Sequence, residues 1–275
     1  MAGTTIHNDI VLQDRDNALL RTLTEDFRVL SREQIGELFP MGSVARLNFR
    51  LKQLRDAGYL SSRPLAGLGT AVKRGYYLGP RAIELLSDPI ERRVATSARS
   101  QAAQLAPTGL EHRMLVDSVH IRFLTAASDY PNYKLVTWID QYSSWWEEVR
   151  SYGVPVQADG YGEYLMLLHF DSLFTFFLEV DRGTEGGKTI QEKIARYIEY
   201  AESGSYERQF AAKPFRVLFV AASRRRAESL LKMTAAQTNK IFWITSWDRF
   251  KKAKILDAFW FRPGHEGMYS LLSDV

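Results

Sequence analysis

The chain has 275 residues, of which 45% are hydrophobic and 25% charged, the balance of a globular protein long enough for two ordinary domains. It contains no cysteine, which excludes disulfide frameworks, Cys-ligated zinc or iron–sulfur sites and thiol nucleophiles. Its apolar runs are far shorter than the roughly 18 residues of a membrane span, and the first residues lack a signal-peptide pattern. We therefore expect a cytoplasmic protein with no membrane partner.

Charge is distributed unevenly along the chain. Residues 43–81 carry a net charge of +7, residues 101–205 a net −7 and residues 206–254 a net +9. Two basic segments on either side of an acidic one favour a polyanionic partner, although a solvated Lys and Arg surface explains any single run equally well.

The first elements in chain order are helices. The spacing of apolar residues predicts helices over 12–24, 34–39 and 44–57, short strands at 59–60 and 76–78 around a basic tip, and a helix from about residue 80. Three helices followed by a two-stranded ribbon is the order of a winged helix-turn-helix. The run LKQLRDAGYL at 51–60 resembles the end of the recognition helix entering the wing in bacterial winged-helix regulators.

The third helix carries basic and amide side chains opposite its apolar stripe of Val44, Leu47, Leu51 and Leu54. Such side chains can contact phosphates and base edges in a major groove, while a basic wing reaches an adjacent groove. The predicted DNA-contacting residues are Ser43, Arg46, Arg50, Lys52, Gln53, Arg63, Lys73 and Arg74. A winged helix that binds protein would give the same pattern.

A domain boundary is predicted near Ser-Asp-Pro at 87–89, where a helical pattern ends. The residues that follow are rich in Ala, Ser, Arg and Gln. We expect a winged-helix DNA-binding domain over 1–87, a linker or connecting helix over 88–108 and an α/β domain over 109–275.

The second domain alternates helices and strands. The predicted elements are a helix at 110–127, strands at 134–139, 163–169 and 173–180, a helix at 188–202, a strand at 215–221, a helix at 225–236 and a strand at 241–245. This order resembles the αβββαβ core of PD-(D/E)xK nucleases, a mixed sheet flanked by helices.

Three carboxylates carry that resemblance: Asp159 before one strand, and Glu179 and Asp181 at the end of the next. Glu179 and Asp181 are two residues apart, so both face one side of the strand, and the three could bind Mg²⁺ or Mn²⁺. The nuclease signature has Lys where this chain has Asp181. Lys193 and Tyr197, one helical turn apart, resemble the Gln-x-x-x-Tyr helix of RecB-like nucleases and could supply the missing cation. In the alternative interpretation, the acids begin ordinary turns and Lys193 is solvated.

Taken together, the winged helix, the Glu-Val-Asp-Arg-Gly-Thr-Glu run at 179–185 and the Lys-x-x-x-Tyr helix resemble the replication-relaxation family of plasmid, phage and conjugative-element proteins. The resemblance implies a DNA-binding protein that acts in replication, maintenance or transcriptional control of a mobile element, with a weakly active or inactive nuclease-like domain. Two alternatives stay open: a Mg²⁺-dependent endonuclease targeted by its winged helix, and a protein-interaction scaffold. Double-stranded DNA is the expected partner. A homodimer through the second domain fits the sequence, which does not fix the oligomeric state.

Overall fold

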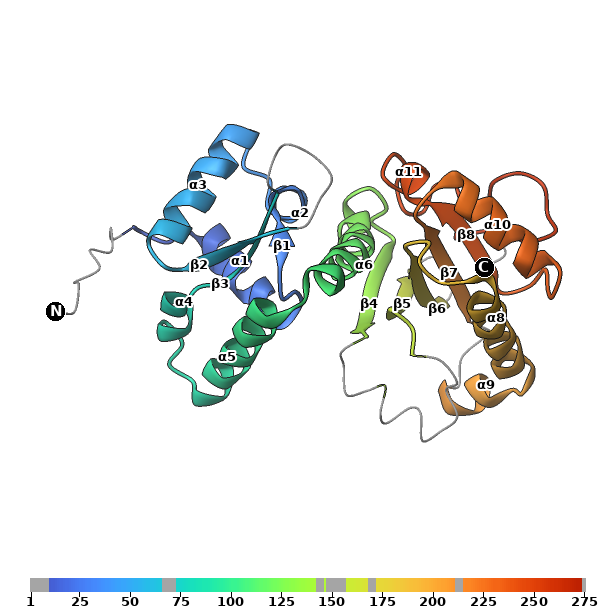
Figure 1. Ribbon diagram of the computed structural model, residues 1–275. Helices are drawn as coiled ribbons and strands as arrows, with labels where there is room; N and C mark the ends of the chain where they lie inside the picture. Colours follow the sequence, from blue (N-terminus) through green and yellow to red (C-terminus); the bar gives the residue numbers. More distant parts are fainter. Residues whose placement is uncertain are drawn as a thin grey trace. The chain divides into compact units, whose positions relative to one another are not determined.

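The computed structural model describes residues 10–65, 73–141, 146, 157–167, 172–210 and 215–273. The chain forms two compact units, residues 1–121 and 122–275 (Figure 1).

The first unit contains a small sheet and a set of helices. Its elements are α1 (Asp14–Glu25), β1 (Leu30–Ser31), α2 (Arg32–Leu38), α3 (Val44–Asp56), β2 (Leu60–Pro64), β3 (Arg74–Leu78), α4 (Pro80–Glu84), α5 (Pro89–Gln104) and most of α6 (Pro107–Thr125). Strand β3 lies between β1 and β2 and pairs antiparallel with both. The predicted helices and ribbon are present. Strand β1 is an addition, because two residues are too few to show an alternating pattern.

Side-chain caps fix the starts of α2 and α3. The Gln34 backbone N–H donates to Ser31 Oγ at 3.2 Å, and the Gln34 side chain accepts from the Ser31 N–H at 2.9 Å, which completes a capping box. The Arg46 N–H donates to Ser43 Oγ at 3.2 Å at the start of α3. Each cap fixes the residue at which its helix begins.

Helix α3 buries the side chains along one side and exposes those on the opposite side. Leu47, Leu51 and Leu54 lie in the core of the first unit. Val44, predicted in the same stripe, is instead 61% exposed, because it occupies the first turn, ahead of the part of the helix that packs on the core.

Helix α5 belongs to the first unit, whereas the sequence suggested a connecting element. Its side chains Ala95, Ala98 and Ala102 are buried in the cores of that unit. The division between the units therefore falls later than the predicted 88–108 segment, within α6. A small-residue face looks like a linker in the sequence because alanine contributes little to an apolar pattern.

The second unit is built on a five-stranded sheet in the order β4-β5-β6-β7-β8. Its elements after α6 are a 3₁₀ turn (Ala126–Ser128), β4 (Tyr133–Asp140), β5 (Gly160–Met166), β6 (Ser172–Asp181), α8 (Gly187–Glu202), α9 (Ser205–Phe210), β7 (Arg216–Ala221), α10 (Arg224–Ala235), β8 (Phe242–Ser246) and α11 (Trp247–Phe250). The pairings β4–β5 and β5–β6 are antiparallel, and β6–β7 and β7–β8 are parallel. The sheet is therefore mixed, with β6 at its centre.

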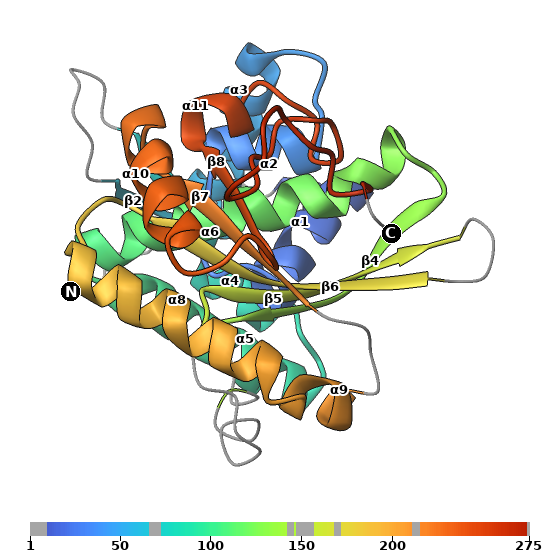
Figure 2. The ribbon, with the colours of Figure 1, turned by 90° about the vertical axis from the view of Figure 1, so that its right-hand side faces the viewer.

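Helices α8 and α10 pack on one face of this sheet (Figure 2). Successive side chains of β6 point to opposite faces. Phe177 lies in the core formed with α8 and α10. Phe176 faces the other side, where it stacks on Phe123 of the last turn of α6 with ring centroids 4.5 Å apart. The alternation fixes which β6 side chains point toward α8.

Strand β5 begins at Gly160, three residues before the predicted 163–169 segment, and two of those three residues are glycines. A Cβ at Gly160 would lie 2.9 Å from the Trp138 ring, and one at Gly162 would lie 2.3 Å from the Phe176 ring. These aromatic side chains fill the space in which a β5 side chain would stand. Glycine has a low strand propensity, so the sequence hides this part of the strand.

Candidate functional site

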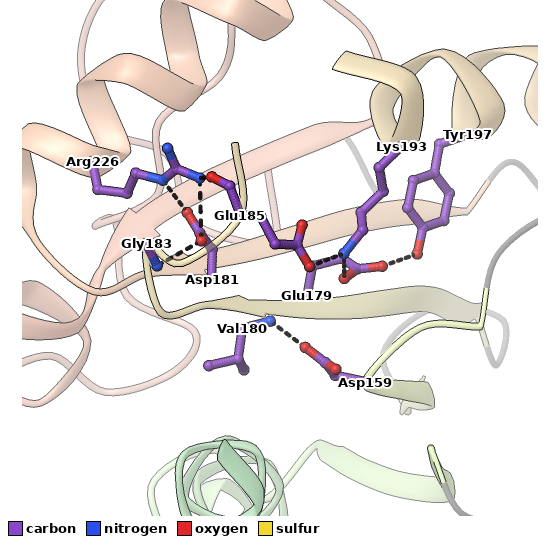
Figure 3. A network of polar contacts seen from close by, with 9 residues as sticks. All are labelled: Asp159, Glu179, Val180, Asp181, Gly183, Glu185, Lys193, Tyr197 and Arg226. Atoms are coloured by element: carbon purple, nitrogen blue, oxygen red, sulfur yellow. Dashed lines mark hydrogen bonds and ion pairs between the residues drawn. The ribbon is translucent and has the colours of Figure 1, made fainter. Parts of the chain in front are cut away.

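A network of charged side chains lies at the carboxyl end of β6 (Figure 3). Glu179 and Asp181 are two residues apart in the strand, and both point to the side covered by α8 and α10. Both are buried, with exposures of 2% and 7%. Two carboxylates so far from water need partners, since an unpaired buried charge is strongly unfavourable.

Glu179 receives its partners from α8. Lys193 Nζ donates to Glu179 Oε2 at 2.9 Å, and the Tyr197 hydroxyl donates to Oε1 at 2.6 Å. Burial raises the pKa of Glu179 to about 7, even though Lys193 acts in the opposite direction. For Lys193, burial acts to lower the pKa, but the nearby Glu179 raises it above its ordinary value, so the cation persists at neutral pH.

Asp181 receives its partners from the following turn and from α10. The Gly183 N–H donates to Asp181 Oδ1 at 2.8 Å, and Arg226 Nε donates to Oδ2 at 2.5 Å. Arg226 Nη2 also donates to the Glu185 carbonyl at 2.9 Å. Arg226 therefore joins the end of β6 to the turn that leads into α8.

Asp159 meets the same strand from the residue before β5. Its Oδ2 accepts from the Val180 N–H at 2.7 Å, and its own backbone N–H donates to the Leu178 carbonyl at 3.0 Å. The predicted juxtaposition of Asp159 with the end of β6 is thus present. The Asp159 carboxylate accepts the Val180 N–H of β6, which lies beyond the last residue of β6 that pairs with β5.

These carboxylates do not present a metal-binding set of oxygens. Both oxygens of Glu179 and both of Asp181 accept hydrogen bonds from protein donors, and one oxygen of Asp159 is held by Val180. Among the residues that the structure describes, no three His, Cys, Asp or Glu side chains lie close enough together to hold a metal ion. The arrangement therefore does not fit the Mg²⁺ or Mn²⁺ that the sequence led us to expect.

Lys193 and Tyr197 were predicted from the sequence, whereas Arg226 and Glu185 were not. Glu185 Oε1 lies 3.4 Å from Lys193 Nζ. A signal for Arg226 exists in the topology. Asp181 pairs with Ala221 at the ends of the parallel strands β6 and β7, and α10 begins three residues after Ala221. A basic first turn of α10 therefore lies near the last carboxylate of β6.

In the first unit, several predicted DNA-contacting side chains bind within the protein. Arg50 forms an ion pair with the buried Asp16 and donates to the Val11 carbonyl at 2.8 Å and to Gln53 at 3.1 Å. These bonds tie α3 to α1.

Arg63 and Arg74 of the ribbon also have internal partners. Arg63 donates to the carbonyls of Ala102 at 2.9 Å and Ala103 at 3.1 Å, and Arg74 donates to Ser62 at 3.3 Å. Arg63 therefore ties the ribbon to the end of α5.

Other predicted side chains remain exposed. Lys52 is 66% exposed and pairs with Asp56 at 2.6 Å, an exposed contact of little energetic weight. Arg46 and Lys73 are exposed and make no side-chain hydrogen bond or ion pair with the described part of the chain. The tip between β2 and β3, residues 66–72, lies outside the described residues.

The fold and the site together define a two-unit α+β protein with a mixed sheet. The buried carboxylates at the end of its central strand form ion pairs with Lys193 and Arg226. The chain belongs to the replication-relaxation family, whose model matches residues 20–214. This match includes Asp159, Glu179 and Lys193 but ends before β7, so Arg226 lies beyond it. Neither a search of curated proteins nor a search of solved structures found a match. No helix in the described part of the chain is both long and apolar enough to cross a bilayer.

Proposed function

We propose that this protein binds duplex DNA through a winged helix-turn-helix in its first unit and acts in replication, maintenance or transcriptional control of a mobile genetic element. Membership of the replication-relaxation family connects the chain with replication. The observation that carries the DNA-binding proposal is the outward face of α3, on which Arg46, Phe49 and Lys52 are exposed while the leucines opposite are buried. A helix with a cationic outer face fits a major groove.

The element order supports the same proposal. Helices α1, α2 and α3 precede the β2–β3 ribbon, and short strand β1 pairs with β3. In winged-helix proteins the third helix contacts DNA and the ribbon forms the wing. Lys73, exposed immediately before β3, is positioned for a wing contact with an adjacent phosphate.

For the second unit we propose a PD-(D/E)xK-like domain that does not cleave DNA. Support comes from the order α6, β4, β5, β6, α8, β7 and from the contacts of Glu179 and Asp181. Lys193 and Arg226 occupy the carboxylate oxygens that a catalytic metal would need. The domain then serves as architecture, and its charges stabilise the fold.

The first test is a combined binding and cleavage assay with the full chain. We expect fluorescence anisotropy to report binding to duplex DNA, and we expect the same duplex to stay intact in millimolar Mg²⁺ or Mn²⁺. Nicked and branched substrates should also stay intact.

Cleavage by the native protein that Asp159→Ala abolishes, with binding retained, would establish the alternative of a metal-dependent endonuclease. Failure to bind any duplex would instead favour the protein-interaction scaffold.

A second prediction concerns Phe49, which is 64% exposed at the centre of the outward face of α3. An aromatic side chain in a major groove makes apolar contact with the thymine methyl group. Replacing thymine by uracil in a duplex selected from a random library removes that methyl and should weaken native binding by about fourfold at the contacted base, since a buried CH₂ or CH₃ contributes about 0.8 kcal/mol. The Phe49→Ala variant should bind both duplexes equally. If uracil at every position left the affinity of the native protein for the duplex unchanged, the prediction would be wrong.

A further inference from the structure

A hollow of about 420 Å³ opens on the surface of the first unit. Three segments line it: the start of α1, the turn between α2 and α3, and the first half of α3. The lining includes Gln13, Arg15, Met41, Gly42, Arg46 and Arg50. Three arginines at one hollow are unusual, because like charges in close proximity repel unless something compensates them.

One of the three arginines is already compensated. Arg50 is paired with Asp16, which is 1% exposed, so its charge is neutralised within the protein. Its bonds to Asp16 and to the Val11 carbonyl hold one wall of the hollow in place. The wall is therefore fixed before any ligand arrives, which reduces the entropic cost of binding.

The other two arginines keep their charge available. The side chains of Arg15 and Arg46 are exposed, and neither makes a hydrogen bond or ion pair with the residues that the structure describes. Arg15 was not among the residues singled out from the sequence, since it lies on a different helix from Arg46 and 31 positions away.

Arg46 lies beside the turn at Gly42, and both residues line the hollow. Gly42 has φ of +76°, a left-handed conformation that favours glycine. A Cβ at this position would lie 3.5 Å from Arg46 Nη1, so the guanidinium lies against the backbone of the turn. Arg46 and Arg15 of α1 both line the hollow.

We infer that this hollow binds a phosphate group between Arg15 and Arg46. Each guanidinium offers several N–H donors in a planar fork that matches phosphate oxygens, and an anionic phosphate between the two cations reduces their mutual repulsion. Because the hollow adjoins the outward face of α3, the phosphate belongs to the DNA backbone beside the bases that α3 contacts. This assignment rests on the proposed DNA-binding function. The same chemistry would also accept the phosphate of a free nucleotide.

The test compares Arg15→Gln with a matched control in the full chain. Arg15→Gln should weaken binding to preferred and to random duplexes by roughly tenfold each, and should reduce the slope of log Kd against log salt by about one. Arg21→Gln changes an exposed arginine of the same helix that does not line the hollow, and it should leave both quantities unchanged.

Single neutral methylphosphonate linkages, placed one at a time in the duplex, identify the contacted phosphate. At one position the linkage should weaken native binding by about tenfold and cause no further loss in Arg15→Gln. In a separate arm, millimolar ATP is added to the native protein and to Arg15→Gln without DNA, and the melting temperature is measured. A rise for the native protein alone, with DNA binding unchanged by Arg15→Gln, would support the hollow as a phosphate site for free nucleotides.

The failures are distinguishable. A native protein that binds no duplex contradicts the proposed function, and the ATP arm still decides whether the hollow binds phosphate. A native protein that binds duplex equally well after Arg15→Gln, with no coupled phosphate and no response to ATP, overturns the inference and leaves the proposed function standing.

Discussion

Raising the monovalent salt concentration from about 50 to about 200 mM should weaken binding of the native protein to duplex DNA by roughly 10³-fold or more. The physical reason is counterion release: each phosphate neutralised by Lys or Arg frees a condensed cation, and about six such contacts give a loss of this size. Residues 43–81 carry eight basic side chains. Arg50 and Arg63 are held inside the protein, and Arg81 lies over the Tyr59 ring. The surface contacts of Lys52 and Arg55 with Asp56 and of Arg74 with Ser62 can exchange for phosphates, which together with Arg15, Arg46 and Lys73 gives about six contacts. The measurement is Kd by anisotropy over a series of salt concentrations.

Two variants of the ribbon separate DNA contact from internal support. Lys73→Gln removes an exposed cation and should lower the salt slope by about one, equally on all sequences. Arg63→Gln removes the bonds to the carbonyls of Ala102 and Ala103, so it should lower the melting temperature and leave the slope unchanged. An affinity that does not depend on salt would contradict DNA binding through this basic segment.

Local signals in the sequence were sufficient to predict the helices of the first unit. The spacing of Leu47, Leu51 and Leu54 and the cap at Ser43 depend on residues within one or two turns, and both are present in the structure. The internal roles of Arg50 and Arg63 were not predictable in this way. Their partners lie on α1 and α5, 34 and 39 positions away, and no local pattern indicates which outward cation turns back to the protein.

At the end of β6, too, contacts between residues close in the sequence could be predicted, whereas contacts between distant residues could not. Lys193 and Tyr197 were predicted together because positions four apart share a helix face, and both contact Glu179. Arg226 reaches Asp181 only through the parallel pairing of β6 with β7, a long-range feature of the sheet. Without that partner, the cluster of acids looks in the sequence like an incomplete metal site.

Lys193→Met should destabilise the second unit strongly at about pH 8 and weakly at about pH 5. Removing the lysine leaves the buried Glu179 without its cation, and breaking a buried pair costs about 3–5 kcal/mol. We expect about 3 kcal/mol at the higher pH, because the Lys193 side chain retains 22% exposure. The measurement is urea unfolding followed by tryptophan fluorescence. All six tryptophans lie in residues 122–275, so the signal reports the second unit alone.

The sign of the pH dependence follows from the Glu179 carboxyl. Burial raises its pKa in the folded protein above the ordinary value of 4.5, to about 7, and loss of Lys193 raises that pKa further. Below about pH 4.5 the folded and unfolded states are both protonated, and no charge is buried. Between about pH 4.5 and the folded-state pKa, the unfolded state ionises while the folded state stays protonated, so stability falls as the pH rises. In the variant the folded-state pKa is higher, so this fall continues to a higher pH than in the native protein.

Two comparisons isolate this effect from packing. Tyr197→Phe removes only the hydroxyl that donates to Glu179 at 2.6 Å, and it should cost about 1–3 kcal/mol with the same direction of pH dependence. Lys188→Met changes a lysine of the same helix whose side chain is 91% exposed, and should be nearly neutral at both pH values. If Lys193→Met were equally destabilising at pH 5 and pH 8, the loss would come from packing of the lysine stem. The stability of the folded protein would then not depend on the ion pair between Lys193 and Glu179.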